Sequence, residues 1–323
     1  MKTVCKIPFL IFFLVILTRS MLIAQDNDFD KILWTADWSP DGKYIAVGGN
    51  HDSLKIFSGK TFKRLKTYPI RETITKVKWH PSKNLLAIAT QGEVGKVLIL
   101  DFDLGQFTSL NNGIFSGARG LDWNHNGQYL AVGDGEGVVH LFTQNAKHLR
   151  SIEKEDTKSY TTLSWHPSEN IFVVASSKVR LYDIEGNAIK VFKHRAEEVL
   201  ILCTDWHPSG DFFALGDYGD NIQNHTPLLQ FFNAEGSTLE SVEGSKAEYR
   251  TLAWHKSGKV IATASDALRI WNKEGILLAE SPSFKGNLWG LDWNPKGNRI
   301  ITTSGNGKVQ IWNKKAKLLR TLE

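Results

Sequence analysis

The chain has almost no cysteine. Its 323 residues include only two, Cys5 and Cys203, and Cys5 lies in a segment that we expect to be removed. A single remaining thiol excludes an intramolecular disulfide and any metal site built on cysteine pairs. Cys203 stands in an apolar run, which favours a core thiol over a reactive one, because reactivity requires a basic and accessible setting.

Other absences narrow the possible functions. No block of like charge accompanies the net charge of +5, so nothing favours a nucleic-acid partner or an anionic membrane. The sequence contains no G-x-S-x-G, no H-E-x-x-H and no phosphate-binding glycine loop, which are the common signatures of hydrolases and nucleotide-binding enzymes. We therefore expect a non-enzymatic protein with no catalytic residue, no cofactor and no metal.

Long apolar runs are also rare, and the clearest one lies at the N-terminus. Two lysines precede the apolar stretch 7–17, and small residues follow it up to Ala24. This order is typical of a secretory signal peptide, and the stretch is shorter than the ~20 residues that span a membrane. We expect a signal peptide over 1–24, with Ser20 as a second cleavage site and an uncleaved anchor as the alternative. The mature chain, 25–323, is then periplasmic or secreted and contains no membrane span.

What the chain has in quantity is tryptophan in a repeated setting. Seven tryptophans recur at intervals of 39 to 48 residues, each at the end of a short apolar run and before a turn. They are Trp38, Trp79, Trp123, Trp165, Trp206, Trp254 and Trp293. A period of this size indicates one supersecondary unit in several copies, none of which buries its apolar face alone. We interpret the seven as structural residues, because large flat side chains fill the space between such units.

The last copy shows the unit most clearly. Residues 288–293 alternate as a short strand does, and 299–303 are rich in β-branched residues. Two further strands are predicted over 308–312 and 318–322, with an Asn-Gly hairpin signal before the first of them. The sequence therefore predicts an all-β fold with four antiparallel strands in each copy.

The third strand ends in an aromatic residue in most copies, and a loose Trp-Asp pair follows there, as in Tyr182-Asp183 and Trp312-Asn313. Together with the repeat, these residues make the chain similar to the WD-repeat β-propeller family over its mature length. The resemblance implies a seven-bladed β-propeller that binds protein or peptide partners at its loop-rich face and channel mouth. The copies are expected at about residues 32–68, 72–110, 115–152, 158–193, 197–243, 247–282 and 286–323.

Ring closure is expected to depart from the family pattern. Family members commonly complete the last blade with an N-terminal strand, whereas the last copy here contains its own fourth strand, 318–322. The segment 25–30 is too polar for a convincing extra strand. We expect the first blade to pack directly on the seventh, in a monomer.

Histidine follows four of the repeated tryptophans, and aspartate precedes four. The histidines occupy equivalent places on different blades, too far apart to share a metal, so we interpret them as turn-stabilising side chains. The aspartates are expected to pair with local backbone or with a neighbouring Arg or Lys, with a cation site near the channel mouth as the alternative. The residues are His80, His166, His207 and His255, and Asp37, Asp122, Asp205 and Asp292.

Function is expected where the copies differ. The position four residues before the repeated tryptophan holds, in turn, Trp34, Thr75, Arg119, Thr161, Leu202, Arg250 and Trp289. Tryptophan and arginine are enriched at interface hot spots, so Trp34, Arg119, Arg250 and Trp289 are the predicted partner-binding anchors. Trp34 and Trp289 belong to the first and seventh blades, where they form either an aromatic platform or a seal of the junction.

The longest interval follows Trp206, and it contains an enlarged loop over 216–227. Long loops on rigid scaffolds often carry function. The predicted binding residues therefore also include Asp217, Tyr218, Asp220, Asn221 and His225. An inert insertion is the alternative, and calcium is disfavoured because the twelve-residue calcium-loop pattern is missing.

Two other functions stay open at this point. One is an exported propeller enzyme of hydrolase type, with a dispersed carboxylate–histidine site at the channel mouth. The other is a small-ligand or glycan binder that uses Trp34 and Trp289 as its platform.

Overall fold

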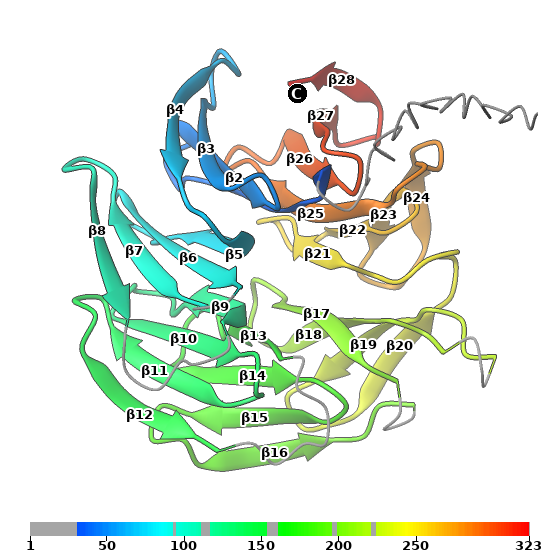
Figure 1. Cartoon of the computed structure of the whole chain (residues 1–323). Helices are drawn as coiled ribbons and strands as arrows, with labels where there is room; N and C mark the ends of the chain where they lie inside the picture. The colour runs from blue at the N-terminus through cyan, green and yellow to red at the C-terminus, as the bar shows by residue number, and fades with distance from the viewer. Residues whose placement is uncertain are drawn as a thin grey trace, which may run out of the picture.

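The computed structural model describes residues 31–92, 95–110, 117–153, 161–195, 199–220 and 224–322. Every regular element in these ranges is a β-strand, and the strands form seven sheets of four. The sheets are arranged as blades around a central axis (Figure 1). The predicted seven-bladed propeller with four antiparallel strands per blade is confirmed, while the predicted signal peptide lies outside the described residues.

Each blade consists of four strands that are consecutive in the chain. The strands are β1 (Leu33–Trp38), β2 (Tyr44–Gly49), β3 (Ser53–Ser58), β4 (Arg64–Pro69), β5 (Thr73–Trp79), β6 (Leu85–Gln91), β7 (Val97–Asp101), β8 (Gln106–Leu110), β9 (Ala118–Trp123), β10 (Tyr129–Asp134), β11 (Val139–Thr143), β12 (His148–Ile152), β13 (Thr162–Trp165), β14 (Ile171–Ala175), β15 (Val179–Asp183), β16 (Ala188–Phe192), β17 (Ile201–Trp206), β18 (Phe212–Asp217), β19 (Leu229–Asn233), β20 (Thr238–Val242), β21 (Thr251–Trp254), β22 (Val260–Ala264), β23 (Leu268–Asn272), β24 (Leu277–Glu280), β25 (Leu288–Trp293), β26 (Arg299–Ser304), β27 (Val309–Asn313) and β28 (Leu318–Thr321).

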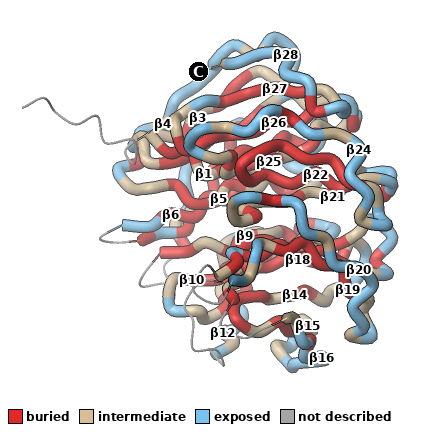
Figure 2. Tube along the Cα trace, turned by 90° about the vertical axis from the view of Figure 1, so that its right-hand side faces the viewer, coloured by how far each residue is buried: buried red, intermediate tan, exposed pale blue. Residues whose placement is uncertain are grey.

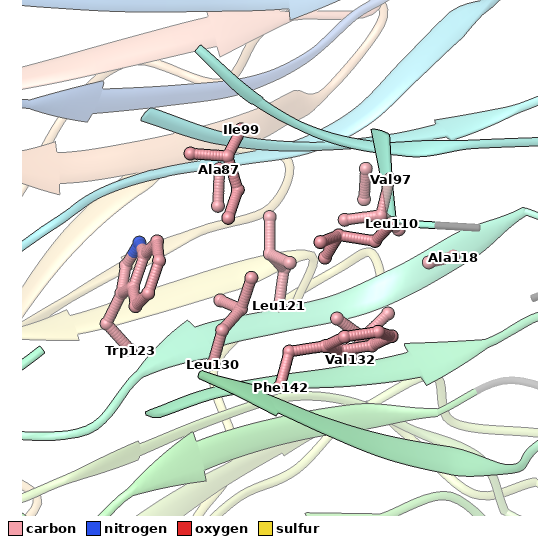
Figure 3. Close-up of a cluster of buried hydrophobic side chains, with 11 residues drawn as sticks. Ala87, Val97, Ile99, Leu110, Ala118, Leu121, Trp123, Leu130, Val132 and Phe142 are labelled. Atoms are coloured by element: carbon pink, nitrogen blue, oxygen red, sulfur yellow. The ribbon is translucent and has the colours of Figure 1, made fainter. Parts of the chain in front are cut away.

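The core lies between the blades rather than at one centre. Buried apolar side chains form seven clusters, and each cluster joins two neighbouring blades. Burial is concentrated on inner strands such as β18, β22 and β25, whereas outer strands such as β28 are exposed (Figure 2). Figure 3 shows the cluster between blades 2 and 3, with Trp123 beside Ala87, Ile99 and Leu121. Each of the seven repeated tryptophans is at most 7% exposed.

Blade 1 packs directly on blade 7, as the sequence predicts. The last strand, β28, pairs with β27 and completes its own blade. Leu33, Trp38 and Val47 of blade 1 share a buried cluster with Ile301 and Ile311 of blade 7. Closure therefore relies on the same apolar packing that joins every other pair of blades.

Histidines link successive blades in addition to stabilising turns. The Nδ1 of His80 accepts hydrogen bonds from the backbone N–H groups of Ser82 and Lys83. Its Nε2–H is left to donate to the carbonyl of Gly127 in the next blade, at 3.1 Å. The corresponding links join His166 to Gly210, His207 to Gly258 and His255 to Gly297. Each of these rings also lies edge-on to the tryptophan of the following blade, at 4.7–5.0 Å between centroids.

The four aspartates act between blades. This corrects the expected pairing with local backbone, whereas the expected pairing with a lysine is found for Asp37, which lies 3.3 Å from Lys78. The Oδ2 atoms of the four aspartates accept hydrogen bonds from the backbone N–H of the repeated tryptophan in the next blade, at 2.7–2.9 Å. The pairs are Asp37 with Trp79, Asp122 with Trp165, Asp205 with Trp254, and Asp292 with Trp38. The last pair crosses the closure, so blades 7 and 1 are joined by the same bond as blades 1 and 2.

Candidate binding surface at the channel mouth

The predicted anchor residues lie where the first strands begin. In several blades the first strand has a register shift at this position, for example between Leu33 and Thr35 in β1 and between Leu288 and Leu291 in β25. A β-bulge bends the strand and redirects the side chain of the extra residue. The shifts therefore account for Trp34 and Trp289 standing at the mouth of the channel rather than between blades.

The structure brings the four anchors together into one group, which we call the mouth cluster: Trp34, Arg119, Arg250 and Trp289. The two indole rings meet edge to face, with centroids 4.6 Å apart. The guanidinium carbon of Arg250 lies 4.0 Å from the ring centroid of Trp289, and that of Arg119 lies 5.4 Å from the ring of Trp34. Each cation–π contact contributes about 0.5–1 kcal/mol at a partly exposed site. The four side chains thus form a continuous Arg–Trp–Trp–Arg run.

Polar neighbours hold the mouth cluster in place. The indole N–H of Trp34 donates to the side-chain carbonyl of Asn50 at 2.7 Å. Arg119 donates from two nitrogens to the side-chain oxygen of Gln91, at 2.9 and 3.0 Å. Arg250 is ion-paired with Glu248. All four members stay half-buried, so the cluster is both fixed in position and open to a partner.

A small cavity of about 40 Å³ lies inside the mouth cluster. Its charged lining residues are Lys76, Arg119 and Arg250, and no carboxylate from the described part of the chain lines it. Lys76 stands three residues before Trp79 rather than four, so it is not among the predicted anchors. At the position three residues before the repeated tryptophan, the other six copies have Thr, Gly or Cys. A comparison of the copies at this position therefore singles out Lys76 as the one charged residue.

Below Lys76 the channel widens to a cavity of about 410 Å³, where the four aspartates gather around Lys78. The ammonium of Lys78 lies 3.3 Å from Asp37, whose charge raises the lysine pKa. Burial raises the pKa of Asp205 to about 6. Burial, together with the charge of Asp37, raises the pKa of Asp292 to about 8. These carboxylates are therefore poor candidates for a fully ionised cation site.

A groove on the loop-rich face adjoins the mouth cluster, and no motif in the sequence indicates it. It has a volume of about 680 Å³ and lies between blades 1 and 2, with Asp52, Arg71, Glu72 and Gln91 in its lining. Gln91 is also the partner of Arg119. Gln91 therefore lies both in the lining of the groove and against the mouth cluster.

The enlarged loop of blade 5 presents fewer binding groups than the sequence suggests. Asp217 is 1% exposed, pairs with Arg195 at 2.9 Å, and accepts hydrogen bonds from the backbone of Gly219 and Leu228. It therefore shapes the loop from inside. Asp220 and His225 join through a backbone bridge. Tyr218, at 52% exposure, projects from the loop, while Asn221 lies outside the described residues.

A serine–histidine–aspartate line occurs in blade 3, away from the channel mouth. His140 contacts Asp134 through Nε2 at 3.0 Å and Ser151 through Nδ1 at 2.9 Å. The hydroxyl of Ser151 is shared with a second imidazole, that of His148. Since His140 is only 2% exposed, we interpret this line as a buried network that ties the loop before β11 to β12. The core position expected for Cys203 is found as well, at 5% exposure.

The described part of the chain also lacks two further features. No three His, Cys, Asp or Glu side chains there lie close enough together to hold a metal ion. In the same ranges, no helix has the length and apolar character needed to cross a membrane.

The ring of blades and the mouth cluster define a β-propeller with a candidate partner-binding face. A family model described as WDR19 first beta-propeller matches residues 34–204, more than half of the chain. A model of the WD domain, G-beta repeat, matches residues 279–313, and one of the eukaryotic translation initiation factor eIF2A matches residues 133–288. The chain therefore belongs to the family of WD-repeat β-propellers.

Curated relatives are similar at low identity. The ribosome biogenesis protein ERB1 of Phaeosphaeria nodorum is 22% identical, over 85% of this chain and 43% of the relative. The eukaryotic translation initiation factor 3 subunit I of Sclerotinia sclerotiorum is 24% identical, over 57% of this chain and 58% of the relative. Cell division cycle 20.1, cofactor of APC complex, of Arabidopsis thaliana is 21% identical, over 92% of this chain and 57% of the relative. The chain thus spans less than two thirds of the length of each of these relatives.

Proposed function

We propose that the protein is a non-enzymatic scaffold that binds a protein or peptide partner at its loop-rich face, with the mouth cluster as the anchor. The observation that carries this proposal is the half-buried Arg–Trp–Trp–Arg run held at the channel mouth. Aromatic residues and arginine dominate interface hot spots because they bury much surface at a modest entropic cost. A single packed run of both types concentrates binding energy at one point.

Two observations support a peptide rather than a small molecule as the ligand. The cavity at the mouth is only about 40 Å³, far below the ~300 Å³ at which drug-sized pockets begin. The adjoining groove, by contrast, has room for several side chains in a row. Relatives named as a subunit of an initiation factor and as a cofactor of a complex support an assembly role as well.

Peptides selected from a random display library on the immobilised full chain test this proposal. We expect the double variant Trp34→Ala/Arg119→Ala to raise the dissociation constant of the selected peptides at least about tenfold, which corresponds to about 1.4 kcal/mol. The matched control is Phe107→Ala/Arg150→Ala, which removes the same two kinds of side chain from the exposed outer strands β8 and β12. Equal affinity for both variants, with both folded, would disprove the anchor role.

The single variant Trp34→Ala shows whether the two tryptophans bind the partner or only close the ring. If Trp34 and Trp289 only close the junction of blades 1 and 7, Trp34→Ala lowers the unfolding temperature and leaves peptide affinity unchanged. A thermal-shift screen with sugars tests the glycan-binding alternative, because a ligand of the folded state raises the unfolding temperature.

We propose further that the protein is exported and works in the periplasm or outside the cell. The support is the basic start, short apolar stretch and small residues of segment 1–24. The intact mass of the protein purified from its native cell tests this. A chain beginning at Gln25 is expected, and a chain that retains residues 1–24 would contradict a cleaved signal.

A further inference from the structure

We infer that the channel mouth binds a single carboxylate group of the partner, between Lys76, Arg119 and Arg250. This rests on the proposed function, and it specifies the chemistry of the partner at that site. The carboxylate can come from an acidic side chain or from the C-terminus of a peptide, and these two sources are separated by the experiment below.

The first observation that supports a carboxylate is the charge of the residues that line the channel mouth. Among the described residues, the cavity there is lined by three cationic side chains and by no carboxylate, although Glu248 pairs with Arg250 beside it and four aspartates lie lower in the same channel. Walls formed by Trp34 and Trp289 reduce contact with water, and a charge-assisted hydrogen bond is stronger where water is partly excluded. The mouth therefore favours an anion over a neutral or cationic group.

The state of Lys76 is the second observation. Its neighbour Lys78 is paired with Asp37, whereas the ammonium of Lys76 has no hydrogen-bond or ion-pair partner among the described residues, and the charges of Asp37 and Asp122 act on it only at longer range. Burial, and then the charge of Lys78, lower the pKa of Lys76. A carboxylate above Lys76 would add a counter-charge at hydrogen-bond distance, so binding and the charged form of this lysine would favour each other.

The size of the mouth cavity and the shape of its guanidinium groups favour a carboxylate over other anions. A cavity of about 40 Å³ has room for a group of one to two water volumes, which suits a planar carboxylate better than a tetrahedral phosphate. The guanidinium groups of Arg119 and Arg250 lie over the two indoles, and Gln91 and Glu248 hold them in place. Planar, preorganised guanidinium groups match the planar carboxylate.

Three short peptides test the inference on the full mature chain at low ionic strength. Acetyl-Gly-Gly-Glu-Gly-Gly-amide carries a side-chain carboxylate only, and acetyl-pentaglycine with a free C-terminus carries a terminal carboxylate only. Acetyl-Gly-Gly-Gln-Gly-Gly-amide carries neither. Affinity is read from the NMR signals of the indole N–H groups of Trp34 and Trp289. We expect saturable shifts with at least one of the carboxylate peptides and none with the glutamine peptide, and the responding peptide identifies the source of the carboxylate.

Variants then assign the effect to Lys76. Lys76→Gln and Lys76→Met should each weaken carboxylate binding at least about tenfold. Lys256→Gln is the matched control, because Lys256 lines the wide part of the same channel and its loss changes the net charge equally. Unfolding temperatures show that the variants are folded. Equal binding of the glutamine peptide, equal effects of Lys76→Gln and Lys256→Gln, or tighter binding of inorganic phosphate than of both carboxylate peptides would overturn the inference.

The two sets of variants distinguish failure of the carboxylate inference from failure of the proposed scaffold function. If the library-selected peptides lose affinity with Trp34→Ala/Arg119→Ala but not with Lys76→Gln, the scaffold proposal stands and the carboxylate inference fails. If neither change affects them, both fail.

Discussion

Replacing Trp123 with alanine should destabilise the protein by about 3–5 kcal/mol, the cost of emptying a large aromatic site in a packed core. The ring is 5% exposed and lies in the cluster between blades 2 and 3 (Figure 3). It also meets His80 edge-on at 5.0 Å and donates from its indole nitrogen to the carbonyl of Lys78 at 3.2 Å. The change therefore removes apolar, aromatic and polar contacts across one junction at once.

Thermal and urea unfolding measure this effect. A loss of this size lowers the unfolding temperature by on the order of 10 °C for a chain of this length. The control is Leu149→Ala on β12, where the side chain is 37% exposed and the expected change is within about 0.5 kcal/mol. A cost below about 1 kcal/mol for Trp123→Ala would show that the repeated tryptophans do not hold the blades together.

Glycine to alanine at position 127 should cost about 3 kcal/mol, for two separable reasons. The backbone of Gly127 has φ of 74°, where a side chain costs about 1–2 kcal/mol. An added Cβ would also lie 2.1 Å from Nε2 of His80, so the link between blades 2 and 3 must shift. Packing conflicts of this kind typically cost a further 1–3 kcal/mol.

Gly105→Ala measures the cost of the backbone conformation alone. Gly105 has φ of 69°, and nothing lies within 4 Å of an added Cβ. We expect Gly105→Ala to cost only the backbone term, and His80→Ala to relieve part of the cost of Gly127→Ala in the double variant. Equal losses of unfolding free energy for Gly105→Ala and Gly127→Ala would mean that the His80 ring does not restrict a side chain at position 127.

The fold could be predicted from the sequence because each blade is specified locally. The strand alternation, the turn residues and the interval between tryptophans all lie within one copy, so Trp38 to Trp293 fix the number and phase of the blades. The mode of ring closure could be predicted because the last copy contains its own fourth strand, 318–322, which is β28 (Leu318–Thr321) in the structure. The four residues of the mouth cluster could also be predicted, because a comparison of the copies at one position singles them out.

What the sequence could not provide lies between copies. The bonds of Asp37 to Trp79 and of His80 to Gly127 each join a side chain to a backbone atom more than 40 residues away, and no local pattern encodes that distance. Asp217 looks like a loop ligand in the sequence, yet its carboxylate turns inward to Arg195. The groove that reaches Gln91 is formed by loops of two blades, so neither repeat shows it alone.

The NMR signals of the tryptophan indoles test the central claim most directly. The chain has eleven tryptophans, and single Trp→Phe variants assign their signals. On adding a library-selected peptide, we predict shifts at Trp34 and Trp289 and none at the seven repeated tryptophans, which lie buried between blades. Binding that shifts the repeated tryptophans and leaves Trp34 and Trp289 unchanged would contradict the mouth cluster as the partner-binding site.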